Sequence, residues 1–96
     1  TTTRNVTTEA AGKKIGGGTL VINAFRTSDP TKCTTIYYDF QLRGGGTNGN
    51  RSNERVVTHN SGVNVGVTDI TEGFRFTNNE SFTVTMTATY DLTGEL

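Results

Sequence analysis

Residues 81–92 alternate between apolar and polar side chains at every position. Because successive side chains of a β-strand point to opposite faces, a period of two places one set on one surface and the other set on the opposite surface. The pattern therefore predicts a strand with one buried and one wet face, and it excludes an amphipathic helix. The expected core residues are Phe82, Val84, Met86, Ala88, Tyr90 and Leu92, and the wet face is a row of threonines followed by Asp91.

Shorter runs of the same kind predict further strands over residues 19–27, 34–43, 55–60, 63–68 and 73–76. Glycine, asparagine and serine gather between these runs, as is typical of turns. No stretch has the spacing of a real helix. We expect an all-β domain, a small antiparallel β-sandwich with immunoglobulin-like or jelly-roll-like connections and about six or seven strands, with a small barrel as the alternative.

Residues 1–18 are polar and end in three consecutive glycines, which predicts a flexible arm with a hinge ahead of one β-sandwich domain over residues 19–96. The arm is either a frayed terminus or a segment that pairs with the sheet edge of another subunit, with Val6 and Ile15 as its apolar contacts. Residues 44–54 read as an irregular loop. Because the chain starts with Thr1, we expect a processed mature form or an excised fragment.

Composition narrows the classes of partner. Nine basic and nine acidic residues give a net charge of zero, so nothing favours nucleic acid or an anionic membrane surface. No apolar run approaches the roughly 18 residues of a membrane-spanning helix, and we expect no membrane insertion. The single cysteine, Cys33, has no partner for an internal disulfide, so stability must come from the sheets or from neighbouring subunits.

We expect no enzyme and no metal or cofactor. The only histidine, His59, and Cys33, which follows Lys32, both read as ordinary strand residues, and the serines lack a nucleophile motif. A zinc site needs three or four suitable ligands. Alternate positions of the 44–54 loop only faintly resemble a calcium loop, because amides stand where aspartates supply the charge.

Tyr37 is the best candidate for a ligand contact, because Asp39, Gln41 and Arg43 follow it along the outer face of the same expected strand. An aromatic ring beside amide and carboxylate groups could bind a sugar, but we favour the interpretation in which a second sheet or a neighbouring subunit covers Tyr37. Three Asn-x-Ser/Thr acceptor sequences are compatible with a secreted protein that is extracellular, on a surface or in a virion. They begin at Asn5, Asn50 and Asn79.

Two functions of different classes remain open. The first is a structural subunit that assembles with copies of itself through strand edges into an extracellular fibre, a pilus-like filament or a viral or surface layer. The second is an adhesive module that binds carbohydrate through the Tyr37 row together with the loop of residues 44–54.

Overall fold

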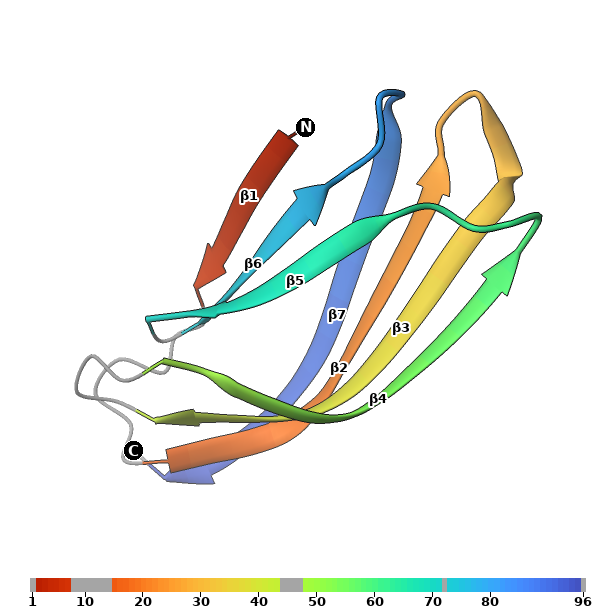
Figure 1. Cartoon of the computed structure of the whole chain (residues 1–96). Helices are drawn as coiled ribbons and strands as arrows, with labels where there is room; N and C mark the ends of the chain where they lie inside the picture. The colour runs from red at the N-terminus through yellow and green to blue at the C-terminus, as the bar shows by residue number, and fades with distance from the viewer. Residues whose placement is uncertain (1, 8–14, 44–47, 72, 96) are drawn as a thin grey trace.

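The computed structural model of the chain describes residues 2–7, 15–43, 48–71 and 73–95, and the side chains of residues 17–41, 48–71 and 73–89 (Figure 1). These residues form strands and turns and contain no helix, which confirms the all-β prediction. The strands are β1 (Thr2–Thr7), β2 (Ile15–Arg26), β3 (Asp29–Arg43), β4 (Asn50–His59), β5 (Val65–Ile70), β6 (Gly73–Asn78) and β7 (Val84–Glu95).

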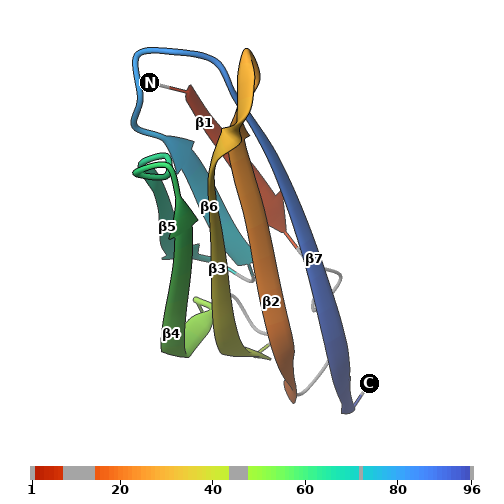
Figure 2. The same ribbon diagram turned by 90° about the vertical axis from the view of Figure 1, so that its right-hand side faces the viewer.

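The described strands lie in two antiparallel sheets, one with the order β1-β6-β5 and one with the order β4-β3-β2-β7. β2, β3 and β4 follow one another along the chain, and β7 returns beside β2, which is a Greek-key arrangement. Figures 1 and 2 show the two sheets as facing layers. The expected sandwich is confirmed, and the alternative of a small barrel is wrong because the sheets do not close on each other.

The core lies between the layers and is centred on β2 and β3. The alternate positions of β3 are buried as predicted, and Ile22 of β2 has no exposed surface. Phe40 from β3 meets Phe74 from β6 edge to face, with ring centroids 5.6 Å apart, and this contact joins the two sheets. The buried cluster consists of Leu20, Ile22, Ile36, Tyr38, Phe40, Phe74 and Phe76.

β7 is an edge strand, and its apolar face is less buried than the sequence predicts. The strand begins at Val84, so Phe82 precedes it, and both side chains are half-buried. Met86 and Ala88 pack against the core but are also only half-buried. An edge strand has a neighbour on one side only, so its side chains are less covered than those of β2. The side chains of Tyr90 and Leu92 lie outside the described residues.

The glycine hinge expected at residues 16–18 is wrong, because these residues belong to β2. Gly17 is paired with Gln41 of β3 and with Thr93 of β7. Pairing on both sides satisfies backbone groups whatever the side chain, so a run of glycines can lie within a sheet. The expected arm also contains β1, in which Val6 is opposite Phe74 of β6. Residues 8–14 and the side chains of Val6 and Ile15 lie outside the described part.

The irregular loop expected over residues 44–54 is also shorter than predicted. β4 begins at Asn50 and runs along β3 with a register shift between Tyr37 and Asp39. Asn53 sits at this irregularity with a φ of 55°, in the left-handed region that asparagine tolerates better than most residues. The bulge accommodates the shift in register, so a polar sequence without regular alternation still continues as a strand. Residues 44–47 lie outside the described part.

Candidate functional site

The predicted ligand row is only partly assembled. Tyr37 and Asp39 lie on the outer face of β3 and line a depression of about 340 Å³ together with Val21 of β2 and with Asn53 and Arg55 of β4. Gln41 lies further along β3, is half-buried and is not among the lining residues. Arg43 ends β3, and its side chain lies outside the described residues.

The polar groups of this depression already bind one another. The guanidinium carbon of Arg55 lies 4.2 Å from the centroid of the Tyr37 ring, a cation–π contact that covers one ring face. Asn53 donates a hydrogen bond of 2.7 Å from Nδ2 to Oδ2 of Asp39. A sugar could stack only on the other face of Tyr37 or displace Arg55. Sequence reasoning singled out neither β4 residue: Asn53 lies within the 44–54 loop that the carbohydrate hypothesis included, and Arg55 lies just after it.

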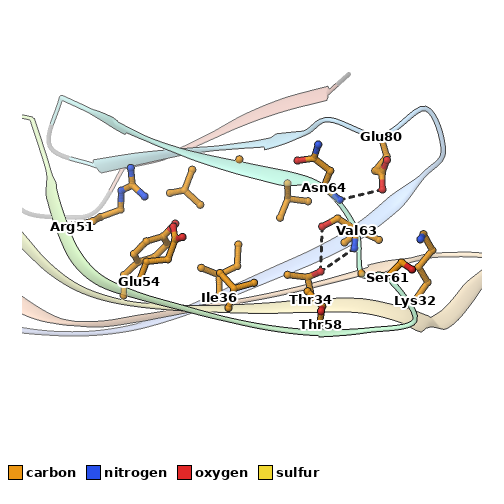
Figure 3. A pocket seen from close by; sticks show the side chains of 16 residues that line it. Lys32, Thr34, Ile36, Arg51, Glu54, Thr58, Ser61, Val63, Asn64 and Glu80 are labelled. Carbon is orange, nitrogen blue, oxygen red and sulfur yellow. Dashed lines mark hydrogen bonds between the residues drawn. The ribbon is translucent and has the colours of Figure 1, made fainter.

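A second hollow, of about 540 Å³, lies between the sheets along β3, β4 and β5 (Figure 3). Val56 of β4 is opposite the buried Ile36 and therefore points into this cleft, yet 48% of its surface is exposed. Val65 and Val67 of β5 line the same cleft. The inner face of β4 is thus incompletely covered by the opposing sheet.

Polar contacts close one end of this inter-sheet cleft. Arg51 Nε of β4 lies 2.6 Å from Asp69 Oδ1 of β5 and joins the sheets, while its guanidinium lies 4.7 Å from the Tyr38 ring centroid. The Tyr38 hydroxyl donates to Glu54 Oε2 at 2.5 Å. Burial, followed by this hydrogen bond to Glu54, raises the pKa of Tyr38 to about 12, so the phenol stays protonated near neutral pH.

The other end of the cleft is held by backbone contacts of the β4–β5 connection. Thr34, which is buried, hydrogen-bonds to both the N–H and the carbonyl of Val63. The N–H of Asn64 donates to Glu80 Oε2 at 3.1 Å. Figure 3 shows these groups, with Lys32 beyond them. The cleft therefore has an apolar middle and polar ends.

The outer edge of β7 is the longest exposed backbone edge in the described part of the chain. β7 has twelve residues and pairs with β2, and no described strand pairs with its other side. Thr87 and Thr89 are exposed on its outer face, as the alternation predicted. The sequence left open whether this strand is central or at an edge, and the structure places it at an edge.

The fold brings the only cysteine and the only histidine together. Cys33 of β3 is directly opposite His59 of β4, so both side chains share the outer face. The thiol donates to the carbonyl of Thr31 at 3.7 Å. Among the residues searched, 2–7, 15–43, 48–71 and 73–95, no three His, Cys, Asp or Glu side chains are grouped to hold a metal ion.

Two of the three glycan acceptors have described side chains. Asn50 is exposed at the start of β4, and Asn79 is exposed between β6 and β7, where its N–H donates to the carbonyl of Asn64 at 3.0 Å. Asn5 lies in β1, and its side chain is outside the described residues. Glycosylation of these sites stays a prediction. The described residues also include no helix with the length and hydropathy needed to span a membrane.

A scan against protein-family models finds no match, and searches of curated proteins and of solved structures find none either.

Proposed function

We propose that this chain is a non-enzymatic structural subunit that assembles with copies of itself through strand edges. The product would be an extracellular fibre, a pilus-like filament or a viral or surface layer. The observation that carries the proposal is the long outer edge of β7, which no described strand covers. An exposed edge presents a row of backbone donors and acceptors, and such a row is a template for pairing with another chain.

The other strands at the sheet edges are less suited to pairing. β1 and β5 have six residues each. β4 carries Arg51, Glu54 and Arg55, and its bulge at Asn53 interrupts the regular ladder. Charged residues and bulges are the devices by which proteins protect edges from pairing. β7 has none of these over its first seven residues, which include no charged side chain.

The overall charge also favours self-association. The net charge is zero, so copies do not repel one another through a common sign. Near-neutral proteins associate more readily than strongly charged ones. The exposed threonines of β7 add a flat, uncharged face next to the edge.

Size measurement tests this proposal directly. We expect multi-angle light scattering of the intact chain to give masses above 10.3 kDa that rise with concentration. Thr87→Lys adds a charge beside the β7 edge and should shift the distribution towards the monomer. Thr19→Lys is the matched control, because Thr19 is exposed on the same sheet but lies on the central strand β2. A wild-type chain that remains monomeric at high concentration would falsify the proposal.

The depression at Tyr37 supports an alternative, an adhesive module that binds carbohydrate. Its aromatic ring could stack on a sugar ring, and the Asp39 carboxylate and the Asn53 amide are the kinds of group that hydrogen-bond sugar hydroxyls. We expect Tyr37→Ala to abolish binding to a glycan array, and Tyr37→Phe, which keeps the ring, to retain most of it. Absence of glycan binding by the intact chain would remove this alternative.

A further inference from the structure

We infer that the β7 edge pairs antiparallel with the β7 edge of a second copy, about a twofold axis at Thr87. This inference rests on the proposed self-assembly and names its partner and register. The result would be one continuous sheet of eight strands with the order β4-β3-β2-β7 followed by its symmetry-related copy.

Every second residue of β7 directs its backbone N–H and C=O groups outward, away from β2. The N–H of Thr27 donates to the carbonyl of Thr83 at 3.1 Å, and the same register continues into β2 and β7, where Phe25 is opposite Thr85. In an antiparallel pair, hydrogen-bonded and non-hydrogen-bonded positions alternate. The odd-numbered residues of β7 therefore bond to β2, and the even-numbered ones direct N–H and C=O away from it. These outward residues are Val84, Met86, Ala88 and Tyr90.

The part of the β7 edge that is open to pairing begins at Val84. Just before β7, the carbonyl of Phe82 accepts a hydrogen bond of 3.1 Å from Asn78 Nδ2. The guanidinium carbon of Arg26 lies 4.4 Å from the centroid of the Phe82 ring. These contacts within the chain occupy this end of the strand, so an incoming strand can pair from Val84 onward.

The distribution of charge along β7 sets the register of the pair. The first charged residue of β7 is Asp91, so residues 84–90 form an uncharged run of seven. An antiparallel pair that uses this whole run, and no charged residue, is centred on Thr87. It places Met86 opposite Ala88 of the second copy, and both residues have the outward backbone groups that such a pair needs. The twofold axis makes the contact isologous and closed, so β7 pairing forms the dimer, and growth of that dimer into a fibre or layer requires a second contact on another surface.

The side chains on the outer face of the four-stranded sheet are compatible with the same register. Thr87 is opposite Asn23 of β2, and Asn23 is opposite Thr35 of β3, whose hydroxyl donates to Asn23 Oδ1 at 2.8 Å. A row of hydroxyl and amide groups thus crosses the sheet and ends at Thr87. A second Thr87 continues this row across the axis with a hydroxyl pair, which is a favourable cross-strand neighbour.

Cysteine cross-linking tests the register. In a Cys33→Ser background, Thr87→Cys should form a disulfide-linked dimer under mild oxidation. Thr87 would face its own copy at a non-hydrogen-bonded position, where Cα atoms are about 4.5 Å apart, within the range that disulfides accept. The same register places Thr85 opposite Thr89 of the second copy. Thr85→Cys and Thr89→Cys should therefore cross-link with each other when mixed and only weakly when alone.

The outcomes separate this inference from the proposed function. If light scattering shows assembly but Thr87→Cys gives no more dimer than Thr19→Cys, the β7 pairing is wrong and assembly uses another surface. Preferential self-cross-linking of Thr85→Cys or Thr89→Cys would overturn the Thr87 axis. If the wild-type chain is always monomeric, both proposals fail. Circular dichroism of each variant confirms that it is folded, and the mixed Thr85/Thr89 pair tests the register without a change at Thr87.

Discussion

The hydroxyl of Thr34 binds the backbone of Val63 twice: it accepts a hydrogen bond from the N–H at 2.9 Å and donates one to the carbonyl at 3.2 Å. Both residues are buried, with 4% and 7% of their surfaces exposed. Val63 lies where the chain passes from β4 in one sheet to β5 in the other. Thr34 therefore fixes this crossing to the inner face of β3.

Thr34→Val should lower the free energy of unfolding by about 2–4 kcal/mol, because it leaves two buried backbone groups without partners. Thr34→Ser keeps the hydroxyl and removes one methyl group, so its cost should be about 1 kcal/mol. Urea denaturation of both variants measures the difference. A larger loss in Thr34→Ser than in Thr34→Val would show that the methyl group, and not the pair of hydrogen bonds, is what matters at this position.

The turn after β4 offers a stabilising change. The N–H of Gly62 donates to the carbonyl of His59 at 2.9 Å, and Asn60 and Ser61 between them have φ values of 52° and 65°. This is the pattern of a type I′ turn, whose third position favours glycine. Ser61→Gly should raise the free energy of unfolding by about 0.5–1 kcal/mol, measured by urea denaturation.

Gly62→Ala, at the next residue of the same turn, should change the free energy of unfolding in the opposite direction to Ser61→Gly. Gly62 has a φ of 64°, and an added Cβ would meet the Thr34 hydroxyl and, at 3.0 Å, the Thr58 side chain. Its free energy of unfolding should fall by at least about 1 kcal/mol. A loss of stability in Ser61→Gly, or none in Gly62→Ala, would contradict this description of the turn.

The raised pKa of Tyr38 predicts that the folded chain loses stability in alkaline solution. Its pKa is about 12 in the folded chain against an ordinary value of 10.0, so folding favours the protonated phenol. This contribution is fully present below pH 10 and is lost as the pH rises from 10 towards 12. Urea midpoints measured across this interval should fall less steeply for Tyr38→Phe, which has no group to titrate. Parallel profiles for the two proteins would refute the assignment.

The Arg51–Asp69 ion pair should couple the two sheets. Its atoms are 2.6 Å apart, and the side chains are 18% and 32% exposed, so solvent screens the pair only in part. A double-mutant cycle with Arg51→Gln and Asp69→Asn should give a coupling energy of about 1 kcal/mol that decreases with added salt. Additive losses would show that the contact contributes no coupling. The cycle is needed because Arg51 also contacts the Tyr38 ring.

Sequence patterning was most accurate where a strand has one fully covered face. The burial of Ile36, Tyr38 and Phe40 in β3 followed directly from alternation. Patterning failed where pairing did not depend on side chains. Gly17 lies in a strand because neighbours bond its backbone on both sides, and Asn53 lies in one because a bulge absorbs an irregular sequence. Of the predicted row, Tyr37 and Asp39 line the depression. Its other polar groups, Asn53 and Arg55, come from the neighbouring strand β4, which alternation along β3 cannot reveal.

The sequence by itself determined that this chain forms β-strands and which faces of those strands are apolar, because a period of two is a local property of side-chain order. Only the tertiary structure decided which strand is central and which lies at an edge, because that depends on pairing between distant residues. β7 has the clearest alternation in the chain, yet it lies at the edge while β2 and β3 hold the core. The same long-range pairing placed Thr34 against Val63 and left the outer edge of β7 free for a second copy in the proposed assembly.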